Sequence, residues 1–354
     1  MNDRIKNILL IAGVGIGAGI FSLPIALKQS GLPLFIAFVV ILGFVMFRIN
    51  YFLREIVLEY KTKNHIPGYA YKLLGKKSGH LAVWMMLLAT FGALIAYAYL
   101  GGNFVSELTG VSPGVGAMLF YTIATGVFFF AGSKLEAIDI DATIMKMVLF
   151  IVICILFVVN LPAVSTEAIP LTIENPYTAY GVILFAFTSI SIIPELHGKR
   201  ESLSTIMIAQ VIILLIYLIF APLGFFYLKN GVFELPQRAM NVLFQLAGLL
   251  AVFTPYQIIS FAARDMLKQD LGTNYTTAKG LIAFVPFVVL LFQVGSFISM
   301  LSLTGAIFIG GMCLMVTLSY QAVFPHKHFW EIQVIQLLLV IGVIVEVLSF
   351  FFFS

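Results

Sequence analysis

The chain has 354 residues, of which 61% are hydrophobic and only 10% are charged, and its mean hydropathy is +1.07. Soluble domains carry about 25% charged residues, so this composition excludes a soluble protein and predicts an all-α integral membrane protein. The formal net charge of +4 does not indicate a nucleic-acid partner, because the basic residues flank apolar segments. Cys154 and Cys313 lie inside apolar segments, so we expect no disulfide framework.

Eleven apolar segments have the length and composition of membrane-spanning helices. They cover approximately residues 5–28, 31–60, 81–108, 113–133, 140–160, 177–199, 203–228, 238–267, 278–296, 298–322 and 331–353. We therefore interpret residues 1–354 as a single transmembrane domain. An odd number of spans places the two ends of the chain on opposite sides of the membrane.

The basic residues are distributed unevenly between the two sides of this predicted bundle. Among the loops and helix ends, only Lys28, Lys229 and Arg238 fall on the side opposite the N-terminus. Loops rich in Lys and Arg stay in the cytoplasm. We therefore predict a multi-pass protein of the plasma (inner) membrane, with a cytoplasmic N-terminus and an external C-terminus.

The first apolar segment contains four glycines at alternate positions, from Gly13 to Gly19, followed by Pro24. An interior glycine costs a helix about 1 kcal/mol relative to alanine, and proline about 3 kcal/mol. In a membrane, an interrupted helix is tolerated where it lines a cavity or is buried in protein. We therefore expect a break in which glycine permits close approach and positive φ. The alternative is a helix contact, because the same glycines form two GxxxG pairs.

A second interruption lies about 170 residues further on, where 187–191 (FTSIS) precedes Pro194. Residues 20–24 align with 190–194, although an alignment this short also arises by chance. The two segments cross the membrane in opposite directions, so the halves are inverted repeats, approximately 5–160 and 177–322, with an extra helix at 331–353. Paired interruptions in inverted halves indicate a transporter binding site.

Residues 15–31 (GIGAGIFSLPIALKQSG) resemble the first-helix signature of amino acid/auxin permease-type transporters, and aromatic or neutral amino acid permeases in particular. These belong to the amino acid–polyamine–organocation superfamily. Further similarity lies at 71–77, at 91–99, and in the pattern formed by 185–187 with 193–195. The resemblance implies a five-plus-five inverted-repeat, leucine-transporter-like fold with broken helices 1 and 6. The chain departs from the family at Thr188 and Ser189, where relatives often have histidine or glycine.

The resemblance also implies where an amino acid substrate binds. Backbone N–H groups of the first break are expected to bind the carboxylate, since a half-helix begins there. Carbonyl groups of the second break are expected to bind the ammonium group. The expected substrate-binding residues are Gly15, Gly17, Ala18, Gly19, Phe185, Ala186, Phe187, Thr188, Ser189, Tyr97 and Tyr256. The alternatives are hydroxyls bonded within their own helix and tyrosines that only pack in the core.

Ionisable residues inside spans are candidates for ion coupling, because burying them is costly. In proton-coupled or sodium-independent relatives, a lysine at the place of Lys146 is proposed to replace sodium; the alternative is snorkelling to the surface. Glu195 is a second proton-carrier candidate, and the alternative is a solvated cytoplasmic cluster with His197 and Lys199. Hydroxyls of Ser22, Thr254 and Ser260 leave a sodium site open. Buried Arg48 and Glu346 receive no transport role, and Glu346 is a candidate oligomer contact.

These observations predict a secondary active transporter of a neutral amino acid, with aromatic and branched side chains as candidates. We expect proton coupling and alternating access, with the bilayer, the amino acid and a proton or sodium ion as partners. A sodium-coupled or exchange transporter of the same fold, and a non-transporting amino acid sensor, are alternatives. The chain shows no hydrolytic triad, P-loop or metal-ligand cluster, so we expect neither an enzyme nor a cofactor.

Overall fold

The computed structural model describes residues 3–60, 64–130, 135–161, 168–173, 176–196, 202–229, 232–235 and 237–352. Its elements in chain order are α1 (Asp3–Gly15), η1 (Ala18–Ser22), α2 (Leu23–Ser30), α3 (Leu32–Tyr60), α4 (Ile66–Leu74), α5 (Lys76–Thr109), α6 (Pro113–Phe130), α7 (Leu135–Asn160), α8 (Pro176–Ala186), η3 (Ile190–Glu195), α9 (Ser202–Phe225), β1 (Leu228–Lys229), β2 (Val232–Phe233), α10 (Arg238–Leu271), α11 (Tyr275–Leu291), α12 (Phe297–Leu303), η4 (Thr304–Ile309), α13 (Gly310–Val323) and α14 (Phe329–Phe352).

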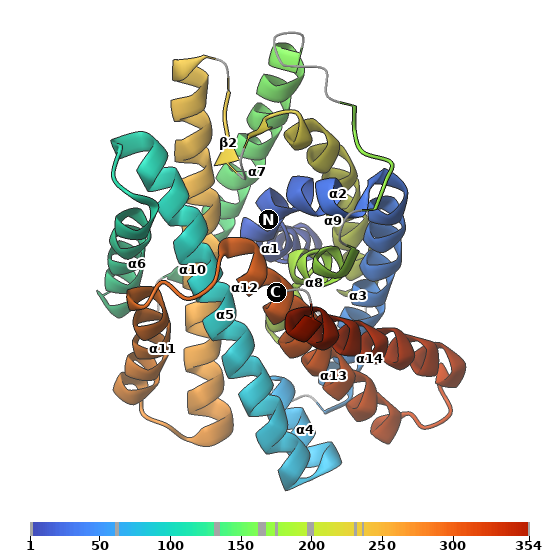
Figure 1. The fold of residues 1–354 in the computed structure, drawn as a ribbon. Helices are drawn as coiled ribbons and strands as arrows, with labels where there is room; N and C mark the ends of the chain where they lie inside the picture. Colours follow the sequence, from blue (N-terminus) through green and yellow to red (C-terminus); the bar gives the residue numbers. More distant parts are fainter. Residues whose placement is uncertain are drawn as a thin grey trace.

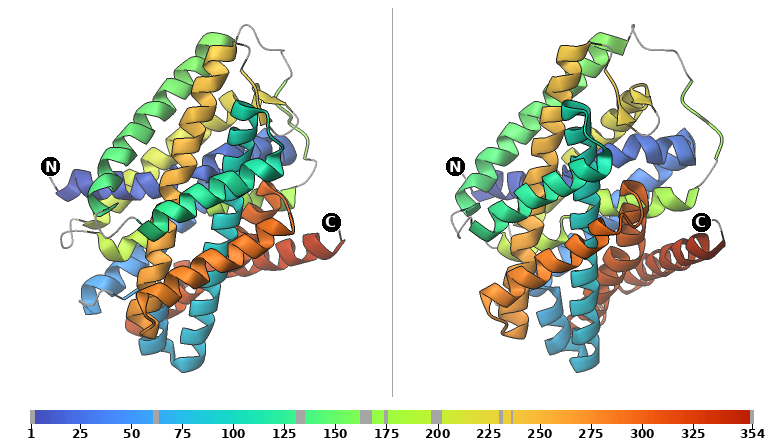
Figure 2. Two further views of the ribbon diagram at one scale, coloured as in Figure 1. Left: turned by 90° about the vertical axis from the view of Figure 1, so that its left-hand side faces the viewer. Right: turned by 60° about the vertical axis from the view of Figure 1, so that its left-hand side comes forward.

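The fold is a helical bundle with the apolar helices of an integral membrane protein (Figure 1). Within the described residues, seven helices are long and apolar enough to cross a membrane, and α1 with η1–α2 forms a further, bent candidate. Shorter apolar helices cover Met147–Asn160, Ala179–Pro194 and Tyr275–Leu291. The two chain ends lie on opposite sides of the molecule (Figure 2). The total of eleven spans and the inverted repeat remain predictions.

The first predicted interruption is present. Helix α1 ends at Gly15, a 3₁₀ segment begins at Ala18, and the two halves of this span meet at an angle of 43°. Pro24 lies in the first turn of α2, where its missing N–H breaks no helical bond. The glycines make the break, and the proline starts the half-helix that follows.

The second predicted interruption is also present. Helix α8 ends at Ala186, non-helical backbone covers Thr188 and Ser189, and the 3₁₀ segment η3 runs from Ile190 to Glu195. The two interrupted spans pack against each other in the interior of the bundle, where α2 contacts α8 (Figure 1).

Two features differ from what the sequence suggested. None of the four glycines from Gly13 to Gly19 adopts positive φ, so the expectation of a left-handed backbone there was wrong. Close approach explains Gly19 instead, because an added Cβ would lie 2.7 Å from the Cα of Ala186. In addition, β1 and β2, each of two residues, pair in an antiparallel hairpin that the apolar pattern did not predict.

A short helix, α4, lies between the second and third predicted spans. Residues 66–70 of this helix are buried, and it packs on α5 and α13. At its N-terminus, the Gly68 N–H donates to Asp270 of α10 at 3.1 Å. Helix α4 therefore covers one end of the bundle.

Candidate substrate site

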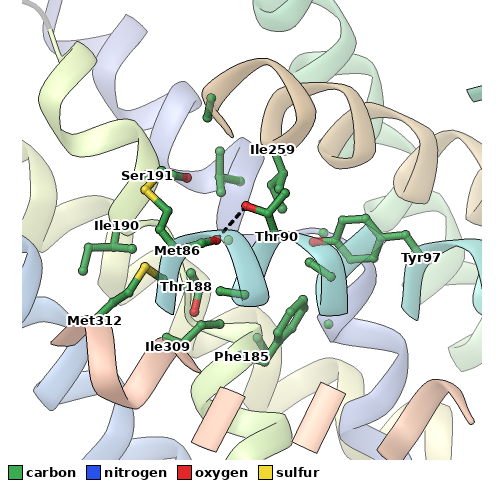
Figure 3. A pocket seen from close by; sticks show the side chains of 18 of the residues that line it. Met86, Thr90, Tyr97, Phe185, Thr188, Ile190, Ser191, Ile259, Ile309 and Met312 are labelled. Atoms are coloured by element: carbon green, nitrogen blue, oxygen red, sulfur yellow. Dashed lines mark hydrogen bonds between the residues drawn. The ribbon is translucent and has the colours of Figure 1, made fainter. Parts of the chain in front are cut away.

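A pocket lies where the two interrupted spans meet α5 (Figure 3). The centre of a water-sized sphere can occupy about 60 Å³ of it, within about 670 Å³ of empty space that includes open solvent. The lining residues are Val14, Gly15, Gly17, Gly19, Ile66, Met86, Ala89, Thr90, Ala93, Tyr97, Phe185, Ala186, Thr188, Ile190, Ser191, Ile259, Ala262, Ile309 and Met312.

The pocket wall is mostly apolar. The Tyr97 and Phe185 rings meet edge to face, with their centroids 6.1 Å apart. Met86 and Met312 contribute thioethers, which adapt to irregular shapes and contact aromatic rings favourably. Such a wall suits a large, planar, apolar group better than a charged one.

Four hydroxyl-bearing side chains line this otherwise apolar pocket, Thr90, Tyr97, Thr188 and Ser191 (Figure 3). Thr90 donates to the Met86 carbonyl at 2.9 Å, and Thr188 donates to the Leu184 carbonyl at 3.1 Å. The alternative expected for Ser and Thr in membrane helices therefore holds for both threonines. Their oxygen atoms still have lone pairs that accept hydrogen bonds.

The first break presents backbone to the pocket through three of its glycines. The Gly17 N–H donates to the Gly15 carbonyl at 2.9 Å, which turns the chain between the two half-helices. The segment η1 then begins at Ala18 and continues directly into α2. The first N–H groups of a helix have no acceptor within it, so that of Gly19, which lines the pocket, suits an anionic group.

The two breaks are joined by Tyr217 of α9. Its hydroxyl, which is fully buried, lies 2.5 Å from both the Gly15 and Ala186 carbonyl oxygens and shares its proton between them. The Phe185 carbonyl accepts the Thr188 N–H at 3.0 Å. The carbonyls of the second break expected to bind an ammonium group are those of Phe185, Ala186 and Phe187; the first two already accept a hydrogen bond, and each has a second lone pair.

Of the expected substrate-binding residues, Gly15, Gly17, Gly19, Tyr97, Phe185, Ala186 and Thr188 line the pocket. The other four are buried nearby but do not line it. Ala18 lies in η1, and the Phe187 ring packs against the Tyr217 ring at a tilt of 57°, with ring centroids 4.8 Å apart. Ser189 accepts a hydrogen bond from Asn50 at 2.9 Å, and the Tyr256 hydroxyl bonds to Thr125 at 2.7 Å. Their roles in binding remain predictions.

The candidate coupling residues are only partly visible. Lys146 lies in α7 and Glu195 in η3, but the side chains of both fall outside the described part of the structure. The hydroxyls of the candidate sodium site each donate within their own span: Ser22 to Gly19, Thr254 to Leu250, and Ser260 to Tyr256.

Several site residues were not expected from the sequence, among them Met86, Thr90, Met312 and Tyr217. The first three lie on long apolar helices where the sequence does not show which face points inward. Tyr217 carried a usable signal, because a tyrosine in the middle of the apolar run 211–220 needs a partner for its hydroxyl. That signal does not identify the partner.

Phenylalanine rings fill the bundle on the side of η1 that faces the hairpin. Phe21 of η1 contacts Phe104, Phe220 and Phe244 with centroid distances of 5.3, 5.9 and 6.0 Å. Phe233 of β2 joins the same cluster at 6.0 Å from Phe21. The pocket extends in the other direction, toward Ile66 of α4.

A membrane bundle in which two interrupted helices meet at a pocket has the architecture of a secondary transporter. The comparisons with known proteins agree with this class. The chain belongs to the tryptophan/tyrosine permease family, whose sequence model matches residues 1–226. The resemblance to aromatic amino acid permeases is thereby confirmed, and the family and fold indicate a permease rather than an enzyme.

Solved transporter structures share the fold across nearly the whole chain. Mhp1, a nucleobase-cation-symport-1 family transporter in a closed conformation with bromovinylhydantoin bound, is 15% identical with a TM-score of 0.67, and the match covers 98% of this chain and 90% of that one. A mutant manganese transporter of Eremococcus coleocola is 11% identical with a TM-score of 0.68, covering 97% and 85%. No curated protein sequence matches the chain.

Proposed function

We propose that this protein is a secondary active transporter of an aromatic amino acid, tryptophan or tyrosine, and that the pocket between the two breaks is its substrate site. The observation that carries the proposal is the juxtaposition of backbone from both breaks with an apolar wall containing Tyr97 and Phe185. The family supports the choice of an aromatic side chain.

Each part of an aromatic amino acid has a counterpart in this pocket. The first N–H groups of η1 would bind the carboxylate, and the remaining lone pairs of the Gly15 and Ala186 carbonyls would bind the ammonium group. The ring would lie among Tyr97, Phe185 and the two methionines. Thr90, Thr188 and Ser191 would bind an indole N–H or a phenol hydroxyl.

The direction of opening follows from the two ends of the site. The phenylalanine cluster around Phe21 would close the pocket on the hairpin side, whereas α4 borders the pocket on the other. With the N-terminus in the cytoplasm, as the basic residues predict, the hairpin side is external. The conformation would then be closed to the outside, and alternating access would require the cluster to separate.

We propose the proton as the coupling ion. The hydroxyls of Ser22, Thr254 and Ser260 each donate within their own span rather than toward a shared point, which favours a proton over sodium. Lys146 on α7 and Glu195 at the end of the second break are the proposed proton carriers.

Uptake into proteoliposomes tests this function. Labelled tryptophan or tyrosine should accumulate when the lumen is made alkaline, and the accumulation should not need sodium. Excess unlabelled tryptophan should compete, whereas a charged amino acid such as lysine should not. Uptake that requires sodium would contradict proton coupling, and absence of any uptake or exchange of aromatic amino acids would contradict the substrate.

A further inference from the structure

An acidic residue occupies the apolar face by which α14 packs on the bundle. Among the described side chains of this helix, the buried positions are Ile332, Ile335, Leu339, Gly342 and Glu346. They follow the three- and four-residue spacing of one helix face. Glu346 is 7% exposed, so it points into the bundle, and the expectation that it contacts a second copy of the chain was wrong.

The described structure provides no counter-ion for Glu346. Helices α8 and α13 and the segment η4 pack against α14, and α12 provides a hydrogen-bond partner. None of these four elements contains lysine, arginine or histidine. The titratable groups of these elements are Tyr177, Tyr180, Cys313 and Tyr320, of which Tyr180 interacts with Glu346.

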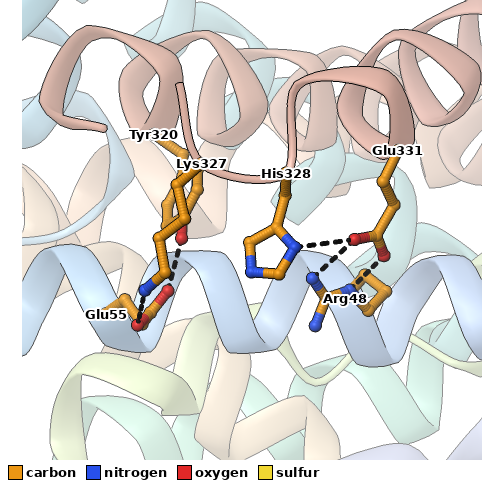
Figure 4. Close-up of polar contacts among 6 residues, drawn as sticks. All are labelled: Arg48, Glu55, Tyr320, Lys327, His328 and Glu331. Carbon is orange, nitrogen blue, oxygen red and sulfur yellow. Dashed lines mark hydrogen bonds and ion pairs between the residues drawn. The ribbon is translucent and has the colours of Figure 1, made fainter. Parts of the chain in front are cut away.

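Basic residues contact α14 at its other end, where Arg48 and His328 lie within ion-pair distance of Glu331. Arg48 of α3 is paired with Glu331 in the first turn of α14 (Figure 4). Glu346 follows fifteen residues later, about 22 Å along the helix. A charged carboxylate buried without a cation costs several kcal/mol, so the surroundings of Glu346 favour its protonated form.

One oxygen of the carboxyl group is bonded and the other is not. The Ser302 hydroxyl donates to Oε1 at 2.6 Å, whereas Oε2 is buried without a hydrogen-bond partner among the described residues. The Tyr180 hydroxyl is also buried there without a partner. It lies against Gly342, one turn before Glu346, where an added Cβ would be 2.2 Å from it. Both groups are thus buried polar atoms without a hydrogen-bond partner, and such surroundings disfavour a charge on the carboxyl group.

The partner of Glu346 is in backbone contact with the helix that leads to the second break. A Cβ added to Gly181 of α8 would lie 2.2 Å from the Ser302 carbonyl oxygen. Gly305 approaches the same residue, since its added Cβ would lie 1.9 Å from the Gly181 carbonyl oxygen. Gly305 belongs to the π-helical segment η4, and such segments are frequent at functional sites. Helix α8 ends five residues beyond Gly181, at Ala186.

We infer that Glu346 is a proton-binding site of this transporter, linked through Ser302 and Gly181 to the second break. The inference rests on the proposed proton-coupled transport and adds a carrier to the two candidates on α7 and η3. In the described conformation the carboxyl group holds its proton. Movement of α8 against α12 and η4 admits water, and the proton leaves Oε2 for that water.

Glu346→Gln tests the inference, because glutamine imitates the protonated carboxyl group and cannot release a proton. In proteoliposomes, tryptophan accumulation driven by an alkaline lumen should fall about tenfold or more, the size of a typical coupling free energy. Tryptophan exchange at equal pH on both sides should persist and lose its dependence on pH. Glu107→Gln, at an exposed acidic residue of α5, should leave both measurements unchanged.

Gradient-driven accumulation by Glu346→Gln at the wild-type level would overturn the inference. If that variant does not fold, Ser302→Ala keeps the acid and removes the donor that stabilises its charge. The pH midpoint of exchange should then move to higher pH by about half a unit or more, and an unchanged midpoint would also overturn the inference. If tryptophan transport by the wild-type protein does not respond to a pH gradient, proton coupling itself is refuted. This result needs no variant, so it is distinguishable from a failure of the inference about Glu346.

Discussion

Gly19 and Ala186 place the backbones of the two breaks in direct contact. Gly19→Ala should lower tryptophan uptake at least about tenfold, because the new methyl group has to push apart the two chains that form the site. Gly126→Ala on α6 is the matched control, since an added Cβ meets nothing within 4 Å there. Equal uptake by both variants would show that the close approach of the breaks is not needed for transport.

Tyr217 acts on the same two segments through its hydroxyl. Tyr217→Phe leaves the Gly15 and Ala186 carbonyls without a shared donor, at a cost of about 1–3 kcal/mol, and should raise the KM for tryptophan about tenfold. Tyr227→Phe makes the same change at a buried tyrosine that donates to the Phe157 carbonyl at 2.5 Å, beside the hairpin. Both variants should lose thermal stability, but a KM that rises equally in both would contradict a positioning role for Tyr217.

Some residues of the site could be predicted from the sequence, and others could not. The glycines and Thr188 could be predicted because each disrupts a helix in a place where the membrane penalises disruption. Phe187 and Ser189 belong to the same break, yet they point to Tyr217 and Asn50 rather than into the pocket. Backbone interruption is a local property of the sequence, whereas side-chain direction at the interruption depends on the packing of α3 and α9.

Two ion pairs of unequal burial join α3 to α14 and to the turn that precedes it (Figure 4). The side chains of Arg48 and Glu331 are 11% and 27% exposed, and those of Lys327 and Glu55 are 45% and 14% exposed. The Arg48 guanidinium also lies over the Tyr51 and Phe52 rings, 4.8 and 4.7 Å from their centroids. Arg48 is therefore held on two sides, by a bidentate carboxylate and by aromatic rings.

The difference in burial predicts a difference in stability. Glu331→Gln should destabilise the protein by about 2 kcal/mol, since it leaves a largely buried guanidinium without its carboxylate. Lys327→Gln should cost less than about 1 kcal/mol, because its charge is exposed and solvated. Thermal unfolding of the purified protein in detergent measures both, and a loss in Lys327→Gln as large as that in Glu331→Gln would contradict this ranking.

The elements differ in how well the sequence predicts them. The long apolar helices and both interruptions could be located from length, hydrophobicity, glycine and proline. The burial of α4 could not, because its residues resemble those of any interfacial helix, and it is buried by contacts with α5 and α13. The π-helical segment η4 could not be predicted either, because its sequence is apolar like that of an ordinary membrane helix. What distinguishes it is a tertiary contact, the close packing of Gly305 on Gly181.

In the molecule as a whole, the pocket lies between two broken helices, with tightly packed side chains at one end and a short helix beside the other. The phenylalanine cluster around Phe21 occupies the hairpin side, and α4 lies on the other. Transport requires the two ends to open in turn, so a ligand that fills the pocket has to alter the access of water to residues that line it. Thr188 suits such a measurement because it belongs to the second break, lines the pocket and is only half buried.

The most direct measurement is therefore substrate protection of a cysteine at position 188. In a background without Cys154 and Cys313, Thr188→Cys should react with a small water-soluble thiol reagent, and tryptophan should block the reaction with a half-maximal concentration close to its KM for transport. A cysteine at Ser204, exposed on α9 and away from the pocket, should react equally with and without tryptophan. Continued tryptophan transport by Thr188→Cys, with labelling that tryptophan does not slow, would show that the substrate binds elsewhere.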